Sequence, residues 1–84
     1  MTKQQELDTK ALERLKYGEH YIIPESDYGK AEIWLINNIY FVFEIPMYGG
    51  DPVYVGNFDR GHWKYPEQKQ KAIKKIIDLV YGWT

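Results

Sequence analysis

The sequence predicts an α+β fold, in which a small antiparallel sheet of three to four strands packs with an N-terminal and a C-terminal helix. Apolar residues recur with the helical period near both ends of the chain, β-branched and aromatic residues alternate through the middle, and an Asn-Asn pair divides the clearest strand segment. The expected order is α-β-β-β-β-α. Because 84 residues leave little room for a second core, residues 1–84 are expected to form a single domain.

The first helix is predicted from its start signal and its apolar arc. Thr2 is followed three residues later by Gln5, which is a capping-box pattern. The apolar side chains then share one helical arc: Leu7, Ala11, Leu12 and Leu15. Gly18 adopts a positive φ without steric cost, so we expect it to end this helix.

A short strand is predicted over residues 20–24 (His-Tyr-Ile-Ile-Pro) from its β-branched and aromatic content. Pro24 favours an edge position in the sheet, because proline has no N–H to donate to a neighbouring strand. Residues 25–30 (Glu-Ser-Asp-Tyr-Gly-Lys) are predicted to be a loop from their Asp, Ser and Gly content.

A hairpin is predicted over residues 31–36 and 39–45, because the Asn37-Asn38 pair tolerates both left-handed positions of a type I′ turn. This two-residue turn pairs Ile36 with Ile39. One face then carries Glu32, Trp34, Ile36, Ile39, Phe41, Phe43 and Ile45. We expect that face to be the core.

The opposite face of the hairpin is also unusually apolar. It carries Ala31, Ile33, Leu35, Tyr40 and Val42, with Glu44 at its end. A solvated sheet face is normally more polar, so we expect a helix, a second copy of the chain or a partner protein to cover it.

The remaining elements are a strand and a helix. Residues 46–52 are turn-rich, and residues 53–58 (Val-Tyr-Val-Gly-Asn-Phe) are expected to form a further strand. Pro66 suits the first position of the closing helix, and Gly82 its C-terminal cap, with Trp83 folding back on the last turn. The helix has a wide apolar arc: Ala72, Ile73, Ile76, Ile77, Leu79 and Val80.

Composition excludes several classes of protein. The chain has no cysteine, so it has neither a disulfide framework nor a thiolate metal site, and we expect a cytoplasmic location. A polar N-terminus and a longest apolar stretch of only residues 39–45 predict no membrane segment. One serine and two distant histidines offer neither a nucleophile system nor zinc-ligand spacing, so we expect no enzyme, metal or other cofactor.

Charge is distributed unevenly along the chain. Residues 19–59 hold seven acidic residues and one lysine, a net charge of −6, whereas residues 60–84 hold six basic and two acidic residues. Acidic residues beside turn aromatics suit a basic protein surface and repel a phosphate backbone. The predicted binding residues are acidic residues, turn aromatics and residues of the second hairpin face. They are Tyr28, Ile33, Leu35, Tyr40, Val42, Tyr48, Asp51, Asp59 and Trp63.

These features predict a non-enzymatic protein-binding module that occludes a partner protein with a basic surface. Small, cysteine-free chains without motifs are typical of phage or mobile-element inhibitors of host proteins, including defence proteins. One alternative is a nucleic-acid-binding protein that uses the lysines of the last helix, Lys69, Lys71, Lys74 and Lys75. Another is a small metal-independent ribonuclease-like enzyme that uses His62 beside Asp59 and Arg60.

Overall fold

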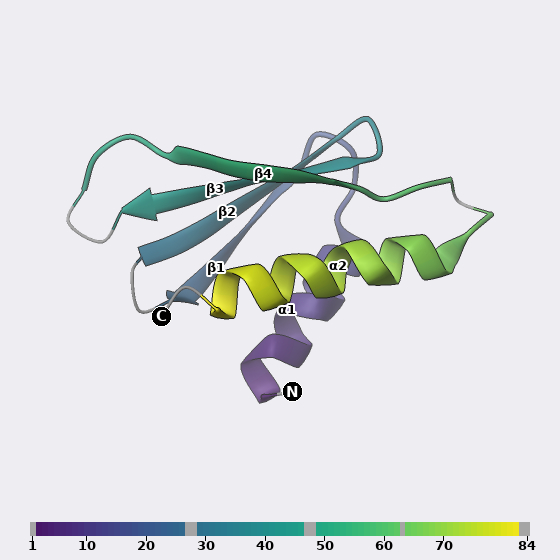
Figure 1. The fold of residues 1–84 in the computed structure, drawn as a ribbon, viewed down its shortest axis with the longest axis horizontal. Helices are drawn as coiled ribbons and strands as arrows, with labels where there is room; N and C mark the ends of the chain where they lie inside the picture. Colours follow the sequence, from purple (N-terminus) through teal and green to yellow (C-terminus); the bar gives the residue numbers. More distant parts are fainter. Residues whose placement is uncertain (1, 27–28, 47–48, 63, 83–84) are drawn as a thin grey trace.

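The computed structural model describes residues 2–26, 29–46, 49–62 and 64–82. The elements are α1 (Lys3–Arg14), β1 (His20–Ser26), β2 (Gly29–Ile36), β3 (Ile39–Pro46), β4 (Val53–Asp59) and α2 (Pro66–Tyr81). The strands form one antiparallel sheet in the order β1-β2-β3-β4, and both helices lie on the same side of it (Figure 1). The expected α-β-β-β-β-α order and α+β class are therefore confirmed.

The central hairpin has the predicted turn and register. Asn37 and Asn38 have φ angles of 54° and 66°, as a type I′ turn requires, and Ile36 pairs with Ile39. β1 is an edge strand, as Pro24 indicated. The loop predicted over residues 25–30 is wrong in extent, because β1 continues to Ser26 and β2 already begins at Gly29. Pairing with the neighbouring strand overrides the loop preference of these residues.

The predicted helix starts are confirmed, and the predicted end of α1 is wrong. Thr2 and Gln5 form both hydrogen bonds of the capping box, and Pro66 is at the first turn of α2. Helix α1 ends at Arg14, before Gly18. Gly18 has a φ of +81° in the turn after the helix, where its N–H donates to the Leu35 carbonyl at 2.7 Å. This glycine connects α1 to the sheet instead of capping the helix.

Gly82 caps α2 without a positive φ. Its φ is −90°, and its N–H donates to the Asp78 carbonyl at 3.0 Å. A Cβ atom at this position would lie 2.7 Å from that carbonyl oxygen, so the close approach requires glycine. The contact predicted for Trp83 lies outside the described residues.

Side chains from three other parts of the fold satisfy the last carbonyls of α1. The Tyr40 hydroxyl of β3 donates to the Leu12 carbonyl at 2.9 Å, and the Lys69 ammonium of α2 donates to the Glu13 carbonyl at 2.6 Å. The Arg60 guanidinium reaches the C-cap carbonyl at 3.4 Å. Two of the three donors are cations, which also favour the negative end of the helix dipole.

The buried face of the sheet is the second hairpin face, and of the three covers expected for it the structure shows the helices. The side chains that point toward the helices are fully buried: Ile23, Ala31, Ile33, Leu35, Tyr40 and Val42. The prediction that Trp34 and Phe41 lie in the core is wrong, because they lie on the opposite face. Both hairpin faces are apolar, and strand alternation identifies which residues share a face without identifying which face the helices cover.

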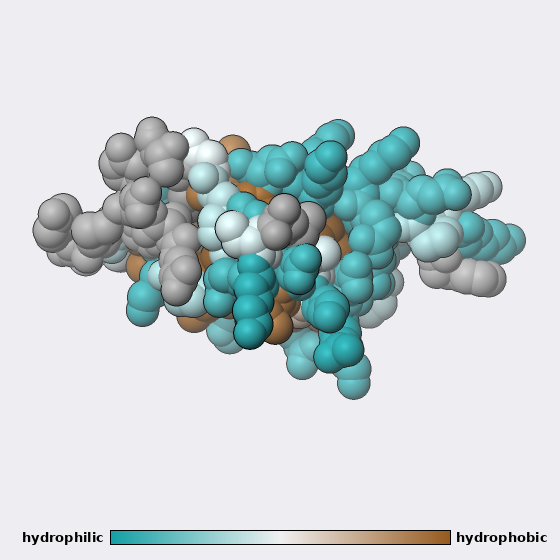
Figure 2. Space-filling view, turned by 90° about the horizontal axis from the view of Figure 1, so that it is seen from below, coloured by the Kyte–Doolittle hydropathy of each residue, from teal (hydrophilic) through white to brown (hydrophobic). Residues whose placement is uncertain are grey.

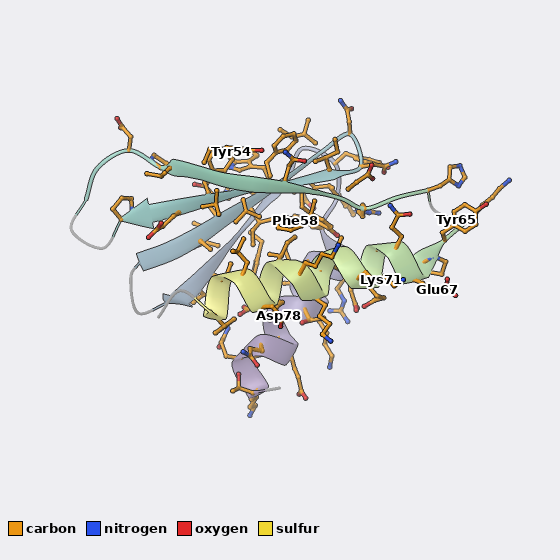
Figure 3. All side chains as sticks on the ribbon, viewed as in Figure 1. Tyr54, Phe58, Tyr65, Glu67, Lys71 and Asp78 are labelled. Carbon is orange, nitrogen blue, oxygen red and sulfur yellow. The ribbon has the colours of Figure 1, made fainter. Side chains whose placement is uncertain are left out.

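The helices bury their apolar residues against this inner face. Helix α2 contributes Ala72, Ile73, Ile76, Ile77 and Val80, and α1 contributes Leu12 and Leu15. In Figure 3, Phe58 lies between β4 and α2, whereas Tyr54 lies on the other side of β4. The fold therefore has two layers, with helices under one sheet face.

A buried carboxylate joins α1 to β1 and to the end of α2. Asp8 is fully buried and accepts hydrogen bonds from Gln4 at 3.0 Å, from the Tyr21 hydroxyl at 2.6 Å and from the Tyr81 hydroxyl. Burial, with the hydrogen bond to Asp8 as a second cause, raises the pKa of Tyr21 to about 12. A buried carboxylate with three donors has its hydrogen-bonding capacity satisfied. Removing it leaves those donors without an acceptor.

We predict that Asp8→Ala lowers the free energy of unfolding by about 2–4 kcal/mol, because two tyrosine hydroxyls lose their acceptor inside the protein. Urea denaturation followed by circular dichroism measures the change. Asp78→Ala is the matched control, because Asp78 is exposed on α2. A loss below about 0.5 kcal/mol, the usual size of a surface effect, would contradict the structural role of Asp8.

We also predict that stability falls as pH rises from 10 to 12. Burial raises the pKa values of both Tyr21 and Tyr40 to about 12, above the ordinary value of 10.0. The folded state therefore holds these protons more tightly, and its advantage is complete below pH 10 and lost as pH approaches 12. The urea midpoint measured across this range should fall less steeply in the Tyr21→Phe variant; equal slopes would contradict the assignment.

Candidate protein interface on the open sheet face

The sheet face opposite the helices, here called the open face, carries aromatic and aliphatic side chains. The strand register places Trp34 beside Phe41 and Glu32 beside Phe43. The open face also includes His20, Ile22, Lys30, Ile36, Ile39, Ile45, Tyr54, Asn57 and Asp59. At its centre, a shallow apolar hollow of about 370 Å³ is lined by Trp34, Ile36, Phe41 and Phe43. No part of either helix covers this face (Figure 1).

Neighbouring side chains hold the aromatic rings of the open face in place. The Trp34 ring stacks on His20 with centroids 4.5 Å apart, and its Nε1 donates to the Glu32 carboxylate at 2.9 Å. Phe43 and Tyr54 meet edge to face at 5.8 Å. Rings already fixed in the free protein lose little freedom when a partner binds, which favours affinity.

The open face exposes several large apolar side chains, and the helix side exposes Leu7 of α1, which is 51% exposed. Ile22 is 41% exposed, Ile36 is 47% exposed and Tyr54 is 52% exposed, while Trp34 and Phe41 are half-buried. The helix side is largely hydrophilic, with hydrophobic residues visible only between polar ones (Figure 2). A contiguous apolar area on one face, next to a polar remainder, is typical of a binding surface.

The structure separates the binding residues predicted from the sequence. The four hairpin residues Ile33, Leu35, Tyr40 and Val42 are 0% exposed and belong to the core, so they are not accessible to a partner. Asp59 is exposed on the open face opposite Ile39, and Asp51 is exposed in the β3–β4 connection. Tyr28, Tyr48 and Trp63 lie outside the described residues.

Sequence reasoning therefore missed the principal residues of this surface: Trp34, Ile36, Phe41, Phe43 and Tyr54. The hairpin pattern did show that both faces were apolar. One helix precedes the first strand and one follows the last strand, and each can pack on either side of the sheet. The pattern alone therefore could not identify the exposed face.

A second group of side chains surrounds the turn end of the hairpin. Two adjoining hollows, of about 610 and 220 Å³, share Tyr17, Asn38, Gly61 and His62. Tyr17 donates its hydroxyl hydrogen to Asn38 at 2.6 Å. The Asp59 carboxylate accepts the Gly61 N–H at 2.7 Å, so this carboxylate closes a turn.

The two cations that line the smaller of these hollows, Arg60 and Lys69, make hydrogen bonds within the fold. Arg60 lies over the Tyr17 ring at 5.7 Å, and both Arg60 and Lys69 donate to carbonyls at the end of α1. Burial, followed by the nearby Arg60 charge, lowers the pKa of Lys69. Of the four lysines in the nucleic-acid alternative, Lys71, Lys74 and Lys75 are exposed on α2, and Lys69 is half-buried.

Two further searches concern the described part of the chain alone. Over residues 2–26, 29–46, 49–62 and 64–82, no three acidic or histidine side chains group as metal ligands. Within the same segments, no helix has the length and apolar character that crossing a membrane requires.

Comparisons with known proteins supply no relative of this chain. No protein-family model matches it, and neither a curated protein nor a solved structure does. The open face is accordingly interpreted from its own geometry.

The face assignment predicts opposite outcomes for two neighbouring residues of β2. Leu35→Ala should lower the free energy of unfolding by about 2–4 kcal/mol, because it leaves a cavity in the core. Ile36→Ala removes a similar volume from a half-exposed position and should cost less than about 1 kcal/mol. Urea denaturation of the two variants measures both values, and a larger loss for Ile36→Ala would reverse the assignment.

Proposed function

We propose that this protein is a non-enzymatic protein-binding module that uses its open face to occlude a surface of a partner protein. The observation that carries the proposal is the apolar hollow lined by Trp34, Ile36, Phe41 and Phe43, on a face that neither helix covers. Interfaces of proteins concentrate their binding energy in aromatic anchors near the centre of the contact. The positions of Trp34 and Phe41 support that role.

The geometry favours binding through a flat contact over turnover of a small substrate. The hollow at the centre of the open face is lined by four apolar residues, so it offers no group for acid–base or nucleophilic chemistry. The charged groups nearest to it are already bonded: Glu32 accepts from Trp34, and Asp59 accepts from the Gly61 backbone. Such a face acts by covering the partner surface, so the proposed mechanism is steric.

The proposal includes the setting expected from the sequence. A cysteine-free chain suits a reducing cytoplasm, and its small size and lack of catalytic motifs suit an inhibitor of a host protein, encoded by a phage or mobile element. Tyr28, Tyr48 and Trp63 stay predicted binding anchors. Identifying the partner would test the proposed location and the proposed role as an inhibitor.

We predict that Phe41→Ser abolishes partner capture without unfolding the protein, because it removes an aromatic anchor from a face that contributes little to the core. Immobilised wild type and variant would be compared by capture from a lysate of the encoding organism, with mass spectrometry of the bound proteins. Thermal unfolding of the variant establishes that it is folded.

Tyr65→Ala is the matched control for this capture. Tyr65 is 60% exposed and lies at the start of α2, away from the open face (Figure 3). It should retain every protein that the wild type binds. If Phe41→Ser captures the same proteins as the wild type, the open face is not the binding surface.

A further inference from the structure

The two layers of the fold carry opposite charge. The sheet and its connections, residues 19–59, have a net charge of −6, whereas residues 1–18 and 60–84 contribute +1 and +4. Because both helices lie on one side of the sheet, the helix layer and the sheet layer differ in net charge (Figure 1). A charge asymmetry of this kind steers and orients an approaching charged partner.

Three acidic residues of this segment lie on or beside the open face. Glu32 and Asp59 project from it within the strands, and Asp51 is exposed in the connection between β3 and β4. Lys30 is the one lysine of the segment 19–59, which contains no arginine, and it projects from the same face opposite Ile45, beyond Glu32. Among the described residues of the open face, the two carboxylates of Glu32 and Asp59 therefore outnumber the one lysine.

This charge distribution discriminates between the possible occupants of the open face. Phosphate backbones and anionic lipid surfaces would meet carboxylates at Glu32 and Asp59. A second copy packed face to face would bring together two open faces that each hold Glu32 and Asp59 against one lysine, a net negative charge that opposes association. A protein surface with an apolar centre and lysine or arginine at its edge matches both the hollow and these carboxylates.

We infer that the partner presents a basic protein surface, with apolar side chains that enter the Trp34–Phe41 hollow and cations that pair with Glu32 and Asp59. This inference rests on the proposed function and adds the chemistry of the partner. The apolar contact provides most of the affinity, while the carboxylates determine which basic surfaces bind and how fast they associate.

The test uses a displayed library of random linear peptides as the probe, selected on the full-length wild-type protein at low salt. The inference expects enriched peptides that combine aromatic or aliphatic residues with lysine or arginine. Their affinity should fall on the order of tenfold between low and high salt, since salt screens exposed charge pairs. They should also fail to bind Phe41→Ser.

Two charge-neutral variants sharpen the test. Glu32→Gln with Asp59→Asn retains oxygen acceptors for the Trp34 and Gly61 hydrogen bonds but removes two negative charges from the open face. This pair should weaken the basic peptides roughly three- to tenfold. The control pair Glu67→Gln with Asp78→Asn removes the same charge from exposed positions on α2 and should change affinity by less than about twofold (Figure 3).

The outcomes separate this inference from the proposed function. Selection of neutral or acidic peptides that still require Phe41 would contradict the inference of a basic partner surface. It would leave the proposed function unaffected. Peptides that bind Phe41→Ser as well as the wild type would overturn the proposed function itself. Light scattering that gives twice the chain mass of 10.0 kDa, and a single chain mass for Phe41→Ser, would identify a second copy as the occupant and overturn the inference.

Discussion

The packing of both helices against one face of the sheet determines the rest of this structure. Tyr40 is central to that packing, because its ring is buried in the inner face and its hydroxyl donates to the Leu12 carbonyl of α1. Asp8 adds a second connection, which ties α1 to Tyr21 of β1 and to Tyr81 of α2. With both helices held there, no element remains to cover the opposite face, and its aromatic residues face outward.

This arrangement links the fold to a binding function through ordinary packing physics. An 84-residue chain can build one two-layer core, and here that core buries most of the apolar side chains of α2 together with Leu12 and Leu15. The rings of Trp34, Phe41, Phe43 and Tyr54 lie outside that core. Trp34 stacks on His20, and Phe43 meets Tyr54 edge to face. Apolar groups that do not stabilise the core and remain fixed are well suited to contact another protein.

Local signals in the sequence were enough to predict the elements, and they could not identify the outward face. The Asn37-Asn38 turn and the Thr2–Gln5 capping box depend on neighbouring residues, so both were predictable. The Asp8 network was not, because its tyrosines are 13 and 73 residues away. Which face is covered depends on where both helices dock, and strand alternation does not determine that. The net negative charge of residues 19–59 was predictable, because it is read directly from the sequence.

The central claim is that Trp34 and Phe41 face solvent while Ile33 and Leu35 are sealed beneath the helices. Solvent paramagnetic relaxation of the isoleucine methyl groups, measured by NMR on the free protein, tests this most directly. The account predicts strong relaxation at Ile22 and Ile36, which are 41% and 47% exposed, and protection at Ile23 and Ile33, which are fully buried. Strong relaxation at Ile23 and Ile33 with protection at Ile22 and Ile36 would contradict it.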